Sequence, residues 1–274
     1  TGHSSIDQSY SADELSNLND HDLISKLETL PNLYAKWIFD QEKIVNDLRR
    51  EHKKVAYEQI KQAKNILNRM KASLLQLQAD SQLGKAFQLA NRAMVKVYEW
   101  KGSSHPLCWR PFQLGFVLLS LESSIDSNSK HRNTSDLLWF PTGGGKTEAY
   151  LLLMSIVLFF RRLKKGGLDF EDGLAVFTRY TLRALTLDQF KRLVGTICAC
   201  ELVRRKELNE TKKGKSFHSR VASSLLRTSG LDELITNSDE EYIEKAVKIA
   251  NDEKYLKHLK DKLNTSRGTN PLFN

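Results

Sequence analysis

Cysteine is scarce in this sequence, whose 274 residues include only Cys108, Cys198 and Cys200. An odd number of cysteines without a C-x-x-C spacing excludes the disulfide framework of small secreted domains, and no histidine pair stands at metal-ligand spacing. We therefore expect buried, reduced thiols, no zinc site and, because no signal peptide opens the chain, a cytoplasmic location. The first residue is threonine, so we expect a piece of a longer protein.

Long apolar runs and an acidic excess are also lacking. The longest apolar run, residues 149–160, is too short to span a bilayer, so we expect no membrane partner. With 42 Lys and Arg against 33 Asp and Glu, the net charge is +9. A basic excess favours an acidic partner, with nucleic acid ahead of membrane, although an ordinary solvated basic surface has the same composition.

Composition divides the chain into five expected parts. Residues 1–20 are polar and predict a flexible lead-in. Residues 21–101 predict a helical domain, 102–108 a linker, and 109–205 the first part of a second domain. Residues 206–274 predict a polar helical segment, either an insertion or the remainder of that second domain.

The helical part has an apolar seam for packing against a neighbour. Its members recur at spacings of three and four: Ile60, Ala63, Leu67, Met70, Leu74 and Leu77. A helical hairpin or bundle and a coiled-coil dimer both fit this seam. Pro31 is expected to stop a short amphipathic segment, Asp80 or Ser81 to cap a helix that ends near Trp100, and Pro111 to open another.

A glycine-rich turn is the most informative stretch of the sequence. Residues 138–150 read LWFPTGGGKTEAY. The three glycines let backbone N–H groups converge on an anion, lysine adds a positive charge, and threonine offers a hydroxyl to Mg²⁺. The predicted ligands are ATP and Mg²⁺, and the candidate residues are Thr142, Gly143, Gly144, Gly145, Lys146, Thr147 and Glu148, with Lys146 and Thr147 as the catalytic pair and Thr147 as the Mg²⁺ ligand.

The surroundings of this turn predict the fold class. Residues 136–140 and 173–180 are typical of buried parallel strands, and residues 150–160 and 186–199 of the helices that follow them. The order strand–helix–strand–helix predicts an α/β fold with right-handed crossovers. With two recognisable strands, we expect a helical N-terminal region followed by an incomplete RecA-like P-loop sheet.

The strict phosphate-loop pattern fails because Phe140 stands where it requires glycine. The variant Pro-Thr-Gly-x-Gly-Lys-Thr, which is matched in full, is that of superfamily 2 helicases. Such helicases often place an Arg-Pro-x-Gln element upstream, and residues 109–113 read WRPFQ. The resemblance implies that Gln113 pairs with the edge of adenine while Arg110 or an aromatic residue covers its face. A helix start with an exposed glutamine is the alternative.

Residues 178–189 follow the second expected strand and resemble the helicase element Pro-Thr-Arg-Glu-Leu-Ala-x-Gln. That element presents N–H groups, a hydroxyl and an arginine to the phosphates of one nucleic-acid strand. The resemblance makes Thr181, Arg183 and Thr186 the contact candidates, although Arg183 could instead pair with an acidic neighbour. Tyr180 replaces the proline, and the spacing is one residue longer.

The acidic pair that hydrolysis requires is missing. None of the Asp-Glu pairs, which begin at residues 13, 232, 239 and 252, follows an apolar strand. A second motor domain is missing too, so we expect that this fragment alone does not turn ATP over.

Several phrases together resemble the helicases of the DISARM anti-phage defence system, the DrmA family. They are residues 33–38, 90–94, 109–114, 136–150 and 179–190, and the similarity extends from about residue 30 to about residue 205. The resemblance implies an ATP-driven DNA motor or sensor in bacterial defence, with DNA as substrate and a companion protein. Two alternatives stay open: another P-loop NTPase that acts as a nucleotide switch, and a non-catalytic helical interaction module.

Overall fold

The computed structural model describes most of the chain. The described residues are 10–102, 105–141, 143–164, 175–179, 183–207, 223, 225–236, 241, 244–245, 247–249 and 252–266. Contacts divide the chain into two compact units: residues 1–166 with 178–204, and residues 167–177 with 205–274.

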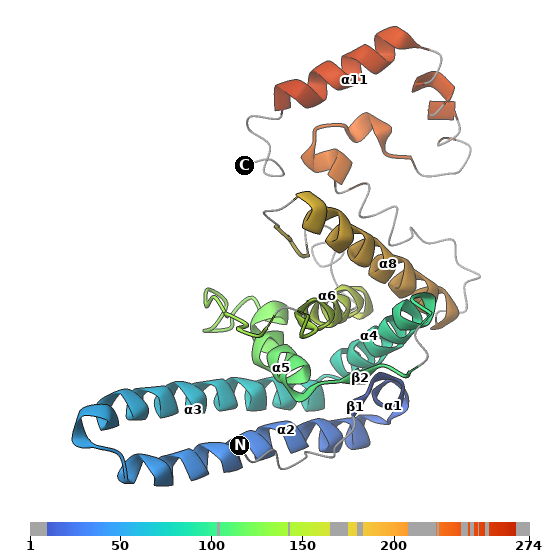
Figure 1. Cartoon of the computed structure of the whole chain (residues 1–274). Helices are drawn as coiled ribbons and strands as arrows, with labels where there is room; N and C mark the ends of the chain where they lie inside the picture. The colour runs from blue at the N-terminus through green and yellow to red at the C-terminus, as the bar shows by residue number, and fades with distance from the viewer. Residues whose placement is uncertain are drawn as a thin grey trace. The chain divides into compact units, whose positions relative to one another are not determined.

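Helices dominate the first unit (Figure 1). They are α1 (Ala12–Asn17), α2 (Asp20–Asn46), α3 (Arg50–Ala79), α4 (Ser81–Trp100), α5 (Pro111–Ile125), α6 (Lys146–Leu163) and α8 (Arg183–Glu207), whose last residues fall in the second unit. A two-stranded antiparallel ribbon joins β1 (Tyr10–Ser11) to β2 (Cys108–Trp109), with Tyr10 opposite Trp109. The second unit contains η1 (Asp232–Leu234) and α11 (Glu253–Ser266).

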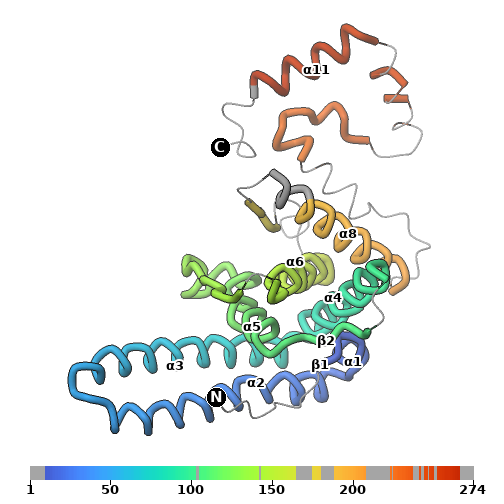
Figure 2. Tube along the Cα trace, viewed as in Figure 1, coloured from blue at the N-terminus to red at the C-terminus, as the bar shows by residue number. Residues whose placement is uncertain are grey.

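Helices α2 and α3 form a long antiparallel hairpin, as the tube trace shows (Figure 2). Its distal end packs Ile38 and Val45 of α2 against Ile60 and Ala63 of α3, all of them buried. In this part of the seam the partner is therefore the preceding helix of the same chain. Five of the six seam residues are buried, which confirms the expected seam: Ile60, Ala63, Met70, Leu74 and Leu77.

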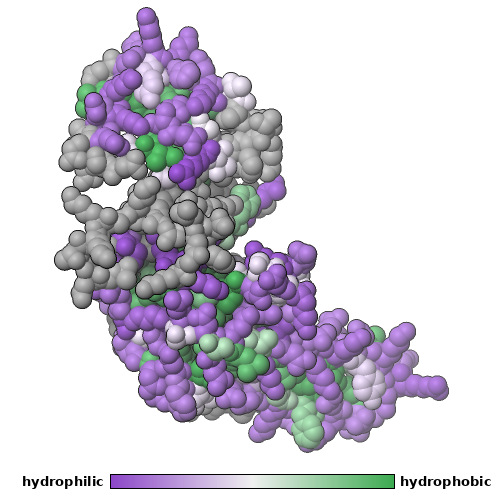
Figure 3. Space-filling model, turned by 180° about the vertical axis from the view of Figure 1, so that it is seen from behind, coloured by the Kyte–Doolittle hydropathy of each residue, from purple (hydrophilic) through white to green (hydrophobic). Residues whose placement is uncertain are grey.

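The surface of the hairpin is mostly hydrophilic, with smaller apolar patches, on the face drawn in Figure 3. The apolar side chains that remain exposed on it include Trp37 at 50%, Ile44 at 52% and Val55 at 61%.

The sequence correctly predicted where α4 and α5 begin. The Asp80 carboxylate accepts hydrogen bonds from the backbone N–H groups of Gln82 (2.9 Å) and Leu83 (3.3 Å), which caps α4 as expected. Pro111 is the first residue of α5. The expected stop at Pro31 is wrong, because Pro31 lies inside α2 and is buried. Packing of α2 along α3 outweighs the hydrogen bond that a proline removes.

Two expected domain limits differ from the structure. Within the expected lead-in, Tyr10, Ala12 and Leu15 are fully buried, so a flexible segment is wrong for residues 10–17. The Ala12 N–H donates to the carbonyl of Leu107 (2.9 Å), so the expected linker is joined to β1 and α1. Residues 1–166 accordingly belong to one unit without a boundary at residues 102–108.

The expected strands are the main difference from the sequence analysis. Within the described residues the only sheet is the β1–β2 ribbon; residues 136–141 and 175–179 have no strand structure, and part of the second expected strand lies outside the described residues. A strand needs a neighbour for its backbone hydrogen bonds, and the described part of the chain offers residues 136–140 none. The helical region is therefore shown, whereas a RecA-like sheet is not.

Across the part of the chain that the structure describes, no helix combines the length and apolarity needed to cross a membrane.

Candidate nucleotide-binding site

The glycine-rich loop precedes α6 and requires glycine at three positions. Gly143 and Gly145 have φ angles of +80° and +89°, in the left-handed region that side chains disfavour. A Cβ at Gly144 would lie 2.5 Å from Cδ1 of Phe140, and one at Gly145 would lie 2.7 Å from Nε2 of Gln113. The loop is thus curled and closely packed. Thr142 lies outside the described residues.

The N-terminus of α6 faces this loop without a side-chain cap. Gly145 is its N-cap residue and has no side chain to accept hydrogen bonds from the first turn. The first-turn N–H groups and the helix dipole favour an anion there. These features fit the phosphates of a nucleotide, and the half-buried Thr147 lies in the same turn.

Lys146 is the first residue of α6 and its amine bonds to the loop itself. Its Nζ donates to the carbonyl oxygens of Phe140 (2.5 Å) and Pro141 (3.3 Å). A phosphate oxygen is a charged acceptor and makes a stronger hydrogen bond with an ammonium group than a carbonyl does. The lysine can therefore exchange these carbonyls for a phosphate without leaving the loop.

The start of α5 holds the loop from the other side. The indole N–H of Trp109, two residues before α5, donates to Oδ1 of Asn91 on α4 (2.7 Å) and holds the chain there. Next to it, Arg110 donates from Nη1 to the carbonyl of Gly144 (3.1 Å). The ring of Phe112 stacks on that of Phe140 at a centroid distance of 3.8 Å.

Gln113 uses both ends of its amide on the backbone. Its Oε1 accepts from the N–H of Arg110 (2.8 Å), and its Nε2 donates to the carbonyl of Gly145 (2.7 Å). The residue is 5% exposed. Gln113 is therefore not an exposed glutamine at a helix start, which was the alternative. It connects the start of α5 to the N-cap residue of α6. Pairing with adenine stays a prediction.

Glu148 would place a negative charge in the first turn of α6, but two cations neutralise it. Its Oε1 lies 3.1 Å from Nη1 of Arg192 on α8 and 3.5 Å from Nζ of Lys101 after α4. Together with Lys146 and Arg110, these cations leave a positive net charge around the loop. The site therefore favours an anion despite its carboxylate.

The structure describes little of the predicted nucleic-acid contacts. Thr181 lies outside the described residues. Arg183 and Thr186 lie in the first turn of α8, and their side chains also lie outside what is described. The same helix contacts the first turn of α6 through the ion pair between Arg192 and Glu148.

The cysteines differ in environment. Cys200 on α8 is fully buried beside the hydroxyl of Ser155 (3.5 Å), and burial raises the pKa of its thiol to about 12. Cys108 is exposed, so the expectation that all the thiols are buried is wrong for this residue. Neighbouring side chains on a strand point to opposite faces, so in β2 Cys108 is exposed while Trp109 is buried.

Sequence reasoning missed several residues that hold the loop. Phe112 stands within the helicase-like pentapeptide, yet only its stacking on Phe140 reveals its role. Lys101 and Arg192 lie 47 and 44 positions from Glu148, and no local pattern connects them to it. The one local indication of such a contact was that an aromatic residue, Phe112, stands next to Gln113.

The C-terminal part of the chain resembles a different group of proteins. Residues 210–274 match the family model described as Glycosyl transferase family 41. Two proteins named as probable UDP-N-acetylglucosamine–peptide N-acetylglucosaminyltransferase SPINDLY, from Solanum lycopersicum and Petunia hybrida, are each 32% identical over 93 residues, 34% of this chain and 10% of their own length. The match begins close to residue 205, where the second unit resumes.

The larger similarity covers most of the chain. A protein named DISARM protein DrmA, from Bacillus paralicheniformis, is 37% identical over 227 residues, which cover 75% of this chain. The chain spans only 19% of that relative's length. Over three quarters of its length, this chain is therefore DrmA-like.

Proposed function

We propose that this chain binds ATP with Mg²⁺ and forms part of an ATP-dependent DNA helicase or translocase in bacterial anti-phage defence. The observation that supports this most is the uncapped N-terminus of α6 beneath two left-handed glycines, Gly143 and Gly145. Lys146 follows directly on the same helix. A glycine turn, a free helix N-terminus and a lysine form the standard cradle for a triphosphate.

Each side chain has a distinct task in this proposal. Lys146 moves from the Phe140 and Pro141 carbonyls to a phosphate oxygen, and the Thr147 hydroxyl holds Mg²⁺. Arg110 keeps Gly144 in place and is close enough to the loop to contact the nucleotide. The bound metal would neutralise charge on the phosphates.

The wider function follows from the similarity to DrmA. A parallel RecA-like sheet would form when residues 136–140 gain strand neighbours, and the acidic hydrolysis pair would come from other parts of a longer protein. Thr181, Arg183 and Thr186 would then contact one DNA strand at the start of α8. A companion protein of the DISARM system is the proposed protein partner.

The direct test is a titration of ATP in the presence of Mg²⁺ with the wild-type chain, Lys146→Ala and Lys71→Ala. Lys71 is an exposed lysine on α3 far from the loop in sequence, and its variant is the matched control. We expect Lys146→Ala to weaken binding at least about tenfold, a loss of one charged hydrogen bond to phosphate, with little change in thermal stability. Equal affinity in all three proteins would contradict nucleotide binding at this loop.

The two alternatives from the sequence are separable from the helicase proposal. A nucleotide switch predicts ATP turnover that DNA does not stimulate in a longer protein that includes this chain. A helical interaction module predicts partner capture by the α2–α3 hairpin that neither ATP nor Lys146→Ala alters. DNA-stimulated turnover that Lys146→Ala abolishes would exclude both.

A second candidate function concerns only residues 210–274, and its support is the match to glycosyltransferase family 41. We propose that these residues belong to a sugar-nucleotide transferase unit. Binding of UDP-N-acetylglucosamine that Lys146→Ala leaves intact supports this second site. Absence of such binding by a longer protein with a complete unit contradicts it.

A further inference from the structure

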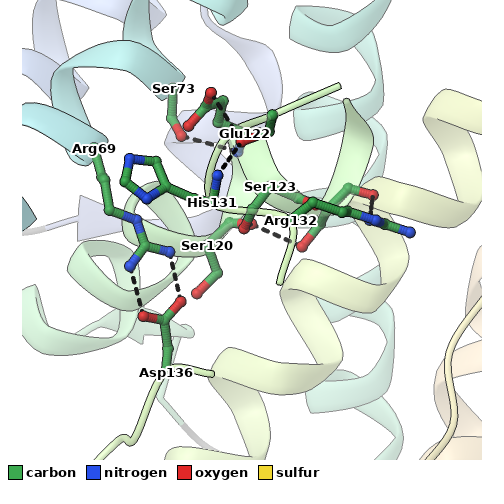
Figure 4. Close-up of polar contacts among 10 residues, drawn as sticks. Arg69, Ser73, Ser120, Glu122, Ser123, His131, Arg132 and Asp136 are labelled. Atoms are coloured by element: carbon green, nitrogen blue, oxygen red, sulfur yellow. Dashed lines mark hydrogen bonds and ion pairs between the residues drawn. The ribbon is translucent and has the colours of Figure 1, made fainter. Parts of the chain in front are cut away.

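A buried ion pair joins the α2–α3 hairpin to the segment that leads into the nucleotide loop. Asp136 stands ten residues before Lys146. Arg69 on α3 donates from Nη1 and Nη2 to the two carboxylate oxygens of Asp136, each at 2.6 Å. Figure 4 shows this two-pronged contact beside the polar contacts between α3, α5 and the connection that follows α5. The two residues are 67 positions apart in the sequence.

Both side chains are largely withdrawn from water. The Arg69 side chain is 8% exposed and that of Asp136 18%. The remaining donor of the guanidinium, Nε, is buried and has no hydrogen-bond partner among the described residues. Among the described residues, Asp136 is therefore the acidic partner of this buried cation, and loss of either member of the pair leaves a desolvated charge.

The connection between α5 and Asp136 is itself folded onto α5. Arg132 donates to the carbonyl of Ser123 (2.7 Å), and the Ser129 hydroxyl donates to Glu122 (3.1 Å). The N–H of Glu122 donates to the hydroxyl of Ser73 on α3 (3.1 Å). Asp136 thus marks the point where a fixed connection ends.

Beyond Asp136 the next three residues lack such support. The structure gives residues 137–139 no regular secondary structure, and Leu137 and Trp139 are 85% and 87% exposed. The loop that follows is held at Phe140 by the ring of Phe112, and at Gly144 and Gly145 by Arg110 and Gln113. The Arg69–Asp136 pair consequently anchors residues 137–139 at their upstream end, whereas Phe112 holds Phe140 at their downstream end.

We propose that Arg69 is a positioning residue for the nucleotide loop, acting through Asp136, so that the helical hairpin determines how often the loop is competent to bind. The proposal rests on the proposed nucleotide function. When only a fraction of molecules is competent, the apparent Kd is the intrinsic Kd divided by that fraction. Releasing Asp136 lowers the fraction and weakens ATP binding without removing any group that contacts ATP.

The experiment compares five proteins: wild type, Arg69→Lys, Asp136→Asn, the double variant Arg69→Met with Asp136→Leu, and Lys64→Met. The double variant removes both charges, so it avoids the unpaired charge that could unfold a single variant. Lys64→Met breaks the exposed ion pair between Lys64 and Glu42, at 2.5 Å on the same hairpin, and is the control. Three quantities are measured for each: Tm, the Kd for ATP with Mg²⁺, and the rate of chymotryptic cleavage after Trp139, since the bond after Phe140 precedes Pro141 and resists the enzyme.

The double variant is expected to have a Tm close to that of the wild type. Its apparent Kd for ATP should be about tenfold higher, which corresponds to a tenfold smaller competent fraction. Its cleavage rate is expected to rise by a similar factor, since proteolysis follows the population of the open segment. Arg69→Lys keeps the positive charge but loses the planar guanidinium with its two parallel hydrogen bonds. Its Kd and cleavage rate should therefore lie between those of the wild type and the double variant. Lys64→Met should match wild type in all three measurements.

The outcomes separate this inference from the nucleotide proposal. If the wild-type chain does not bind ATP, the proposed function fails, while faster cleavage in the double variant still supports Arg69 as the anchor of the segment. If the double variant folds, binds ATP and resists cleavage as the wild type does, the inference is overturned while nucleotide binding stands. A loss of affinity that only accompanies a lower Tm marks a purely structural ion pair and also overturns it.

Discussion

Two neighbouring apolar stretches, residues 137–140 and 151–160, have similar composition but opposite environments. Leu137 and Trp139 are 85% and 87% exposed, whereas Leu152 and Ile156 are completely buried in α6. The difference lies in the backbone. A helix forms its hydrogen bonds within itself, so α4 and α5 can cover it with side chains alone, while a strand must borrow hydrogen bonds from a neighbour. Apolar residues therefore favour burial in both stretches. A helix can be buried by side-chain packing alone, whereas a strand also needs neighbouring strands.

The largest expected effect tests this contrast with one substitution at two sites. Leu152→Ala should lower the free energy of unfolding by about 2–5 kcal/mol, because it removes buried methyl groups and leaves a cavity. Leu137→Ala should change it by no more than about 0.5 kcal/mol, since the side chain already contacts water. Urea denaturation of both variants measures the difference. Similar losses at the two sites would show that residues 137–140 are buried in solution.

The sequence predicted those features that depend on neighbours within about four residues. The cap at Asp80, the start at Pro111 and the apolar seam of α3 all follow from local chemistry. The glycines of the loop belong here too, since positive φ angles at Gly143 and Gly145 follow from the need to turn before α6.

What the sequence could not predict depends on contacts between distant residues. Pro31 lies inside a helix because α2 packs along α3, and residues 10–17 are ordered because β1 pairs with β2. Likewise, no spacing rule connects Arg69 to Asp136 or Glu148 to Arg192. Propensity and motifs describe the chain locally, whereas the geometry of this site depends on tertiary packing.

A smaller effect is expected from the glycine that separates the two stretches. Gly145→Ala should cost about 1–3 kcal/mol, because φ is +89° and the new Cβ would meet Nε2 of Gln113 at 2.7 Å. The control is Gly195→Ala within α8, where the added Cβ would meet no atom within 4 Å apart from its chain neighbours and the backbone of its own helix. That change should stabilise the protein by about 0.5–1 kcal/mol through helix propensity. Opposite shifts in the urea midpoint, with the larger shift from Gly145→Ala, are the expected pattern, and a stabilising Gly145→Ala would show that the loop has another conformation in solution.

The smallest expected effect concerns the tryptophan of the exposed stretch. Trp139→Gln should change the free energy of unfolding by no more than about 0.5 kcal/mol. Trp109→Gln is the contrasting variant, because Trp109 is 3% exposed and donates to Asn91; it should cost about 3–5 kcal/mol. Acrylamide should quench the fluorescence of the Trp109 variant more completely, since the buried indole is then gone.

The same pair of variants also connects the exposed stretch to the proposed RecA-like sheet. If further strands of a longer protein cover residues 137–140, Trp139→Gln should become costly there while remaining neutral in this chain. A loss of stability that appears only in the longer protein would indicate that residues 137–140 form a strand there and lack their neighbouring strands in this chain. If Trp139→Gln stays neutral in the longer protein as well, residues 137–140 are not a buried strand, and the glycine-rich loop then depends on its contacts with α5 and α6 and on the Arg69–Asp136 pair.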